Sequence, residues 1–440
     1  GAVNNNKTVE VLGDNLTFKY NILASTEGGS LYLNDWNATT TTSHLKSYTI
    51  QGNKFQYGAS LDISSGAGIE GLASGRVITA NEFTSDGSTV TWASISFNGT
   101  VPSIGWFTYP VGGATITNNS FSGVPMPIRS RGTVEDDFAW SSYLSDNNFE
   151  KAVIAWDTTN NKPRAFEYYS GSNLINNTIV IGTNITTEIG HAIDGDTIKV
   201  APGTYNEALI LNKPNLKVVS TGGATATIID VPDGNLTTGV KVLADMGTVT
   251  FDGFTVQDFT EGGIIQGMSA GTGTTFKVLN NIVKPAGGYL RNGIQVSGDG
   301  SEVRGNTITS AFLTEDWAST AIGVVDANNV TVSGNTISGV GDYGISVYTW
   351  NESTASNVTV TGNTISGIKS PLGVIAYNHG TVDNVHLHEN KVTGYETALE
   401  AAPYHEVGYE SHWGTAVTNV DATHNWWGNP NGPQAPIIGD

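Results

Sequence analysis

Residues 330–339 read VTVSGNTISG and residues 358–367 read VTVTGNTISG, so nearly the same phrase begins again 28 residues later. Related phrases, each with an asparagine at the same place, occur before and after this pair. In the second half of the chain the column of asparagines comprises Asn280, Asn306, Asn335, Asn363, Asn390 and Asn425. The intervals vary in length while the phrase stays constant, as expected when insertions fall in loops. A repeat of this length indicates a solenoid.

The residues between the asparagines predict which solenoid this is. Each interval contains short, alternating, β-branched runs such as VTVSGNTI and YGISVY, and none contains a long helical apolar pattern. Coils made of short strands stack into parallel sheets, at about 4.8 Å per coil. We expect Val330, Val332 and Ile337 to face inward. We also expect the asparagines to form a ladder at one corner, each side-chain amide bonding the next coil. The sequence therefore predicts an all-β fold, a right-handed parallel β-helix solenoid.

The first half of the chain repeats the phrase with Phe in place of Ile, as GNKF, ANEF, NNSF and DNNF, and then as NNTI. The column predicted from these phrases comprises Asn53, Asn81, Asn119, Asn147 or Asn148, and Asn177. The first half is therefore predicted to be β-helical as well.

Two further stretches resemble the ends of known solenoids. The segment 187–220 contains GDTIKVAPGTYNE, which resembles the opening coil of pectate-lyase-like β-helix proteins. The segment 425–433, NWWGNPNGP, resembles their closing coil, in which Trp426 and Trp427 would cover the apolar end of the stack. The superfamily includes lyases, hydrolases, epimerases, phage tailspikes, adhesins and surface-layer proteins. The resemblance therefore implies an architecture, of the extracellular surface-protein type, and not one activity.

An opening coil in mid-chain implies two β-helix segments in tandem. We predict a first segment over residues 1–180 and a second over residues 181–440, with its opening coil at 187–220 and its closing coil at 420–435.

The composition and net charge of the chain limit the classes of partner that it is expected to bind. The chain has 40 acidic and 20 basic residues, a formal net charge of -20, and no cysteine. Without cysteine it has no disulfide, no thiolate metal site and no cysteine nucleophile. The negative charge repels phosphate backbones and anionic lipids, so no nucleic-acid partner is expected. No run of eighteen apolar residues is present, so no membrane span is expected either. The expected partners are carbohydrate or neighbouring surface proteins.

The expected location is extracellular or at the cell surface. The chain begins at Gly1 without a signal segment, as a mature protein would. Asn-X-Ser/Thr glycosylation sequons occur at Asn15, Asn37, Asn98, Asn118, Asn176, Asn184, Asn235, Asn329, Asn351 and Asn357. They favour an exported glycoprotein.

Aromatic residues near the C-terminus form a candidate glycan-binding strip. Aligning residues 321–325, 344–348 and 373–377 predicts an outward column that includes Tyr348 and Tyr377. Aromatic rings beside small polar residues are suited to stacking on sugar rings. The predicted glycan-binding residues are Tyr348, Trp350, Tyr377, His379, Tyr404, His405 and Trp413, with His412 nearby. Alternatively, these rings pack beneath the long final loop at 402–419 and contact no ligand.

Carboxylates lie near the same strip. Glycoside hydrolysis needs two carboxyl groups roughly 5 to 10 Å apart. Glu400 is distinctive because it replaces Gln, Gly, Ser or Ile in its predicted column. If the chain is an enzyme, the predicted catalytic residues are Glu400, Glu352 and Asp326, with Glu406 and Glu410 also near. The alternative is that these groups are solvated surface charges.

Other chemistries have less support. A polysaccharide lyase needs a basic residue to abstract a proton, and only Arg291, Arg304 and Lys369 are available between residues 285 and 380, without an accompanying Asp cluster. His386 and His388 suit a metal pair, but no third ligand is identifiable, so neither a metal site nor a cofactor is predicted. Calcium is compatible with acidic turns such as SGDGSE, although no spacing matches a known calcium loop.

Two hypotheses remain. In the first, the chain is a non-catalytic extracellular β-helix, a structural, adhesive or surface-layer element that binds glycans. In the second, it is a carbohydrate-active enzyme, a glycoside hydrolase in preference to a polysaccharide lyase.

Overall fold

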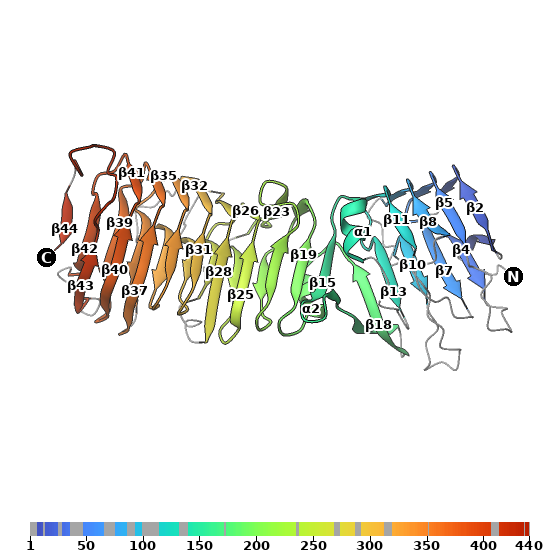
Figure 1. The fold of residues 1–440 in the computed structure, drawn as a ribbon, viewed down its shortest axis with the longest axis horizontal. Coiled ribbons are helices and arrows are strands. Elements are labelled where there is room, and N and C mark those ends of the chain that lie inside the picture. The colour runs from blue at the N-terminus through green and yellow to red at the C-terminus, as the bar shows by residue number, and fades with distance from the viewer. Residues whose placement is uncertain are drawn as a thin grey trace. The chain divides into compact units, whose positions relative to one another are not determined.

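The computed structural model describes most of the chain in sixteen ranges. These are residues 7–11, 14–24, 29–35, 47–65, 75–85, 93–98, 114–131, 140–170, 173–234, 237–267, 273–286, 292–311, 319–350, 352–405, 413–434 and 436–439. The chain divides into two compact units, an N-terminal unit of residues 1–192 with 198–203 and a C-terminal unit of residues 193–197 with 204–440. Each unit is built mainly of short strands stacked in parallel (Figure 1). The tandem division at residues 180 and 181 stays a prediction.

Among the described residues of the N-terminal unit, four parallel coils each contribute one strand to each of three sheets, and a fifth contributes to two of them. The first sheet contains β1 (Lys7–Val11), β4 (Ser30–Asp35), β7 (Ser60–Ser65), β10 (Ile95–Asn98) and β13 (Ile128–Arg131). The second contains β2 (Leu16–Lys19), β5 (Tyr48–Gln51), β8 (Arg76–Thr79) and β11 (Thr115–Thr117). The third contains β3 (Ile22–Ala24), β6 (Lys54–Gln56), β9 (Glu82–Thr84), β12 (Ser120–Ser122) and β14 (Asn148–Phe149).

The first sheet stops being parallel after β13, although β14 still pairs in parallel with β12 in the third sheet. The remaining elements of this part of the chain are α1 (Trp140–Asp146), β15 (Val153–Asp157), β16 (Lys162–Pro163), β17 (Phe166–Ser170), β18 (Asn173–Ile181), α2 (Ile185–His191) and β19 (Thr197–Val200). Strand β18 pairs antiparallel with both β13 and β17. Asn177 lies within β18 and not at the corner of a parallel coil, so extending the asparagine column to it was wrong.

Two side-chain stacks hold the N-terminal coils together. The ladder asparagines are Asn21, Asn53, Asn81, Asn119 and Asn147, and each bonds to the next. The rings of Phe55, Phe83, Phe121 and Phe149 form a second stack, with successive centroids 4.6, 5.0 and 4.9 Å apart. The phenylalanine of the repeated phrase thus fills the interior where each coil meets the next, and all four rings are buried.

The C-terminal unit has the same three-sheet plan. One sheet contains β22 (Lys217–Ser220), β25 (Gly247–Asp252), β28 (Thr274–Leu279), β31 (Glu302–Arg304), β34 (Thr331–Ser333), β37 (Thr354–Thr361), β40 (Thr381–His388) and β43 (Ala416–Asp421). Another contains β20 (Gly203–Tyr205), β23 (Thr227–Asp230), β26 (Thr255–Gln257), β29 (Ile282–Lys284), β32 (Thr307–Ala311), β35 (Thr336–Val340), β38 (Thr364–Ser366) and β41 (Lys391–Thr393). The last contains β21 (Leu209–Leu211), β24 (Thr238–Val242), β27 (Gly262–Gln266), β30 (Asn292–Val296), β33 (Thr320–Val325), β36 (Tyr343–Tyr348), β39 (Ser370–Ala376), β42 (Leu399–Pro403) and β44 (Ile437–Gly439).

The predicted asparagine ladder is confirmed here, with a one-residue correction at its start. It runs through Asn281, Asn306, Asn335, Asn363, Asn390 and Asn425. Asn280, which was predicted, precedes the ladder residue and has a left-handed backbone with φ of 53°. Gly305 and Gly334 occupy the same place in their coils with φ of 68° and 62°. The corner thus needs a left-handed residue followed by asparagine, and two consecutive asparagines made the alignment ambiguous.

The all-β parallel solenoid predicted from the sequence is confirmed. Val330, Val332 and Ile337 are buried, as expected for residues that face the interior. Of the two tryptophans predicted to cover the end of the stack, Trp427 is buried but Trp426 is 44% exposed. Among the described residues, no helix is long and apolar enough to cross a membrane.

Candidate functional site

The predicted aromatic strip lies along three neighbouring strands of the C-terminal unit, β36, β39 and β42. The strand register corrects the predicted column, because Tyr348 pairs with Ile375 and not with Tyr377. Residue 373 pairs with residue 346, so the segment that ends in Tyr377 is offset by two positions from the predicted alignment. Tyr377 therefore follows β39 as Trp350 follows β36.

The rings nevertheless gather into one cluster. The centroid of Tyr377 lies 6.2 Å from that of Trp350, 6.3 Å from that of Tyr348 and 4.9 Å from that of Tyr404. We call Tyr348, Trp350, Tyr377 and Tyr404 the aromatic strip. Trp350 is 43% exposed, whereas the three tyrosines are partly buried.

The remaining predicted glycan-binding residues lie close to the strip. The rings of His405 and Trp413 are 5.3 Å apart and meet edge to face. The backbone amide of His379 donates to the carbonyl of Trp413, and Tyr377 forms an isolated bridge with Trp413. The chain after β42 therefore returns to the strip. Glu406, Glu410 and His412 lie outside the described residues, as do Arg291 and the sequon asparagines Asn37, Asn235 and Asn351.

Glu400 lies on β42 in register with Gly373, and Gly373 is in register with Ser346. Its column therefore contains Gly373 and not Ile375, which corrects the predicted alignment. The hydroxyl of Tyr343 donates to Oε2 of Glu400 at 2.7 Å. A Cβ on Gly373 would lie 2.9 Å from Cδ1 of Tyr343, so the tyrosine ring covers a position where only glycine fits.

The phenol groups of this region stay neutral. Burial raises the pKa of Tyr343 well above its usual range, and the neighbouring Tyr377 and Glu400 raise it further. Burial likewise raises the pKa of Tyr377, with a smaller contribution from Glu400. Tyr343 is therefore a permanent hydrogen-bond donor to the Glu400 carboxylate.

The predicted catalytic carboxylates do not form an evident pair. Asp326, which follows β33, accepts hydrogen bonds at Oδ1 from the backbone amide of Trp350 and from Oγ of Ser353. It thereby holds the turn that carries Trp350. Strand β33, which Asp326 follows, is three strand spacings or about 14 Å from β42. Asp326 is level with Pro403 and not with Glu400, so the backbones of Asp326 and Glu400 are further apart than this strand separation. Glu352 is exposed on the loop after β36, two strands from β42.

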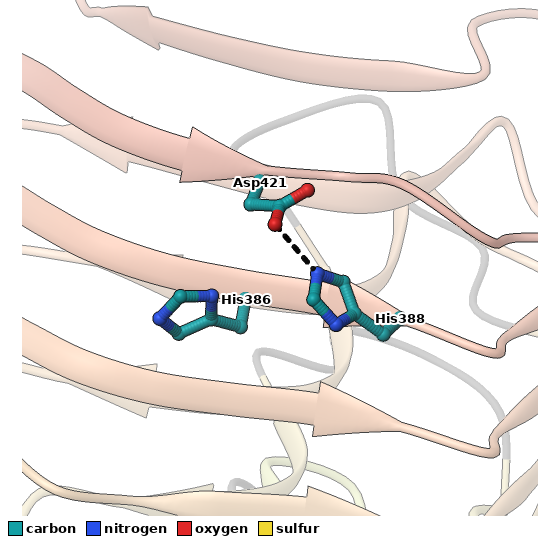
Figure 2. Close-up of side chains that lie close together, drawn as sticks. All are labelled: His386, His388 and Asp421. Carbon is teal, nitrogen blue, oxygen red and sulfur yellow. Dashed lines mark ion pairs between the residues drawn. The ribbon is translucent and has the colours of Figure 1, made fainter.

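A second cluster lies on another sheet of the same unit. His386 and His388 alternate along β40 with the buried Val385 and Leu387, so both imidazoles point outward. Asp421, the last residue of β43, is in register with His386. Figure 2 shows the two imidazoles and this carboxylate close together over neighbouring strands. One ligand atom from each lies within 4.8 Å of the others.

The sequence does not identify Asp421 as a third member of this cluster, because Asp421 belongs to a different coil that follows a long loop. Nothing in the HLH spacing points to it, and the signal that could have found it is the pairing of β40 with β43. The acidic turn at 297–302 has a structural role at Asp299, whose Oδ1 accepts from the backbone amide of Asn328 at 2.8 Å.

Comparison with known proteins concerns the architecture. Residues 238–420 match the family described as right handed beta helix region. No curated protein matches the sequence. Among solved structures, sacteLam55A from Streptomyces sp. SirexAA-E is 12% identical, with 94% of this chain and 89% of that chain covered, at a TM-score of 0.28. A variant of the same protein in complex with glucose is 11% identical, with 95% and 90% covered, at a TM-score of 0.29. At such TM-scores the likeness carries no argument about function.

Proposed function

Residues 238–420 are a right-handed β-helix region, and we propose that the chain is a non-catalytic extracellular or cell-surface protein that binds carbohydrate through the aromatic strip. The observation that carries this proposal is that three successive coils each contribute one ring, Trp350 after β36, Tyr377 after β39 and Tyr404 after β42. The repeat of the solenoid, about 4.8 Å, thus sets the spacing of the rings.

The chemistry of the strip suits a sugar chain. An exposed indole supplies an apolar face for stacking, and Trp350 is the most exposed ring of the strip. Glu400 lies beside the tyrosines, and its carboxylate supplies hydrogen-bond acceptors for hydroxyl groups. An apolar surface with few polar groups is typical of ligand sites.

Binding is favoured over hydrolysis because two of the three candidate carboxylates make structural contacts and belong to coils that are three strands apart in the sheet. Glu400 accepts from Tyr343, and Asp326 accepts from the turn that carries Trp350. The alternative is a glycoside hydrolase that uses Glu400 with Glu352 or Asp326, and a polysaccharide lyase is a more distant one.

The proposed location rests on composition and on the sequons. Net charge of -20 favours solubility and disfavours nucleic-acid and anionic lipid partners. Asn15, Asn118 and Asn329 are exposed sequon asparagines at turns with left-handed backbones, where a glycan has access to solvent.

The test is a glycan-array screen of the purified chain together with a polysaccharide-digestion assay. We expect binding without product release, and we expect Trp350→Ala to weaken binding at least tenfold. Trp426→Ala is the matched control, because Trp426 is 44% exposed and lies outside the strip. Circular dichroism would verify that each variant is folded.

Three results would contradict the proposal. Product release that Glu400→Gln abolishes would establish the hydrolase. Equal loss of binding in Trp350→Ala and Trp426→Ala would remove the strip as the site. If the chain binds no glycan and digests no polysaccharide, carbohydrate is not its partner, and assembly with neighbouring proteins becomes the remaining hypothesis.

A further inference from the structure

We infer that His386, His388 and Asp421 form a binding site for a divalent transition metal ion of the Zn²⁺ class, which joins the last two strands of their sheet, β40 and β43. The inference is independent of carbohydrate binding, because none of these residues belongs to the aromatic strip.

The donor set fits this class of metal. Two imidazole nitrogens and one carboxylate oxygen suit Zn²⁺ and its neighbours, whereas calcium and magnesium prefer oxygen ligands alone. Three protein ligands leave a coordination position open. All three side chains are partly exposed, so an ion can approach the cluster from solvent, although Nε2 of His388 is itself shielded.

The distances are close to those of a coordinated ion. Bonds of 2.0–2.2 Å in a tetrahedral site hold ligand atoms about 3.3 to 3.5 Å apart. Nε2 of His388 and Oδ2 of Asp421 already lie 3.0 Å apart, and the whole set lies within 4.8 Å. Small rotations about the side-chain bonds of His386 therefore complete the site.

The short distance between His388 and Asp421 is not explained by an ordinary hydrogen-bonded ion pair at the surface. Among the described residues, Nε2 of His388 is shielded from solvent and makes no hydrogen bond of good geometry, although Oδ2 of Asp421 lies 3.0 Å away. A nitrogen atom and a carboxylate oxygen thus converge without the linear geometry that a shared proton requires. A metal ion bound by both atoms would stabilise this close approach of a nitrogen and a carboxylate oxygen.

The carboxylate is also held in place from behind. The backbone amide of Thr423 donates to Oδ1 of Asp421 at 3.1 Å, which leaves Oδ2 directed at His388. Such outer contacts orient the ligands in metal sites.

The test is titration of the chain, without a histidine tag, with Zn²⁺ by calorimetry and with Co²⁺ by visible absorption. We expect one equivalent to bind, with a Co²⁺ spectrum of nitrogen and oxygen ligands. His386→Gln and His388→Gln should each weaken Zn²⁺ binding at least a hundredfold, and Asp421→Asn should weaken it at least tenfold. Because β40 and β43 become linked, Zn²⁺ should also raise the melting temperature of the wild type and not of His388→Gln.

Asp383→Asn is the matched control. Asp383 lies on β40 and pairs in register with Thr418 of β43, but its Oδ1 accepts from Thr418 and Asn419 and it is outside the cluster. This variant should bind Zn²⁺ as the wild type does. The inference is wrong if the wild type shows no saturable binding at micromolar Zn²⁺, if Asp383→Asn and Asp421→Asn weaken binding equally, or if both histidine variants retain wild-type affinity.

Discussion

Tyr343 donates a 2.7 Å hydrogen bond to Glu400 although a whole strand, β39, lies between the strands that carry them. The contact is made over Gly373, whose missing side chain leaves room for the tyrosine ring. The hydrogen bond between Tyr343 and Glu400 thus depends on Gly373, which lies on the intervening strand β39.

Gly373→Ala should therefore destabilise the C-terminal unit. Its Cβ would lie 2.9 Å from Cδ1 of Tyr343, so the ring must move and the bond to Glu400 must lengthen or break. We expect a loss of about 1 to 3 kcal/mol in the free energy of unfolding, measured by urea denaturation. In Gly267→Ala, the control, the new Cβ meets no atom within 4 Å, so a comparable loss there would contradict the explanation.

The asparagine ladder predicts a larger effect at Asn335. Its Nδ2 donates to the carbonyl of Val303, and its Oδ1 accepts from the backbone amide of Asn306. Asn335→Ala leaves these buried groups without partners, at about 1 to 3 kcal/mol each. We expect a loss of about 2 to 6 kcal/mol in the free energy of unfolding, followed by circular dichroism in urea.

Asn280 provides the comparison for the ladder. It precedes the ladder residue, and its left-handed backbone suits glycine without strain. Asn280→Gly should change the free energy of unfolding by less than about 1 kcal/mol. An effect as large as that of Asn335→Ala would show that the ladder is not what stabilises the corner.

The phenylalanine stack should be the most sensitive point of the N-terminal unit. Phe83 is fully buried between Phe55 and Phe121. Phe83→Ala should cost about 3 to 5 kcal/mol through lost contacts and the cavity left behind. Ile22→Ala, at a position 69% exposed, should cost less than about 0.5 kcal/mol. Similar midpoints for both variants in thermal unfolding would refute this view of the core.

Two buried tyrosines should respond oppositely to loss of their hydroxyl groups. Among the described residues, the hydroxyl of Tyr48 has no hydrogen-bond partner, whereas that of Tyr143 donates to the carbonyl of Ala114 at 2.7 Å. Tyr48→Phe should therefore stabilise the chain by about 1 kcal/mol or leave it unchanged, and Tyr143→Phe should destabilise it by about 1 kcal/mol. Urea denaturation at neutral pH distinguishes the two.

The same tyrosines predict an alkaline limit of stability. Burial raises the pKa of Tyr48 and of Tyr143 above the value of about 10 for an unfolded chain. Above about pH 10 the folded state then binds more protons than the unfolded state, so the contribution of these two tyrosines to stability is constant below about pH 10 and falls as the pH rises further. Tyr48→Phe should make this fall less steep, measured as unfolding free energy against pH. An unchanged slope would mean that Tyr48 ionises without opening the fold.

The architecture of stacked parallel coils could be predicted from the sequence, but the register of neighbouring strands could not. From Asn281 to Asn425 each coil repeats the corner asparagine, so this ladder was predictable from the repeat. The prediction failed at Asn177, which lies within β18, and where Asn280 and Asn281 offered two equivalent alignments. The rings of the aromatic strip do lie near one another, but the pairing of Tyr348 with Ile375 depends on where β39 starts, which no single residue marks. Asp421 reaches His386 only through pairing across a long insertion, so no local pattern could reveal it.

The asparagine ladder gives the stack a direction. Each Nδ2 donates to the Oδ1 of the asparagine that follows, from Asn281 onward, and Asn425 ends the series by donating to main-chain carbonyls. In each coil of this series the asparagine Oδ1 therefore accepts from the coil before it and the asparagine Nδ2 donates to the coil after it. All of these coils have the same orientation. Excising residues 335–362 would bring Asn363 directly after Gly334 and restore the same head-to-tail contact with Asn306. The solenoid can thus be shortened or lengthened by whole coils without interrupting the asparagine ladder. A coil inserted in the reverse orientation would interrupt these hydrogen bonds.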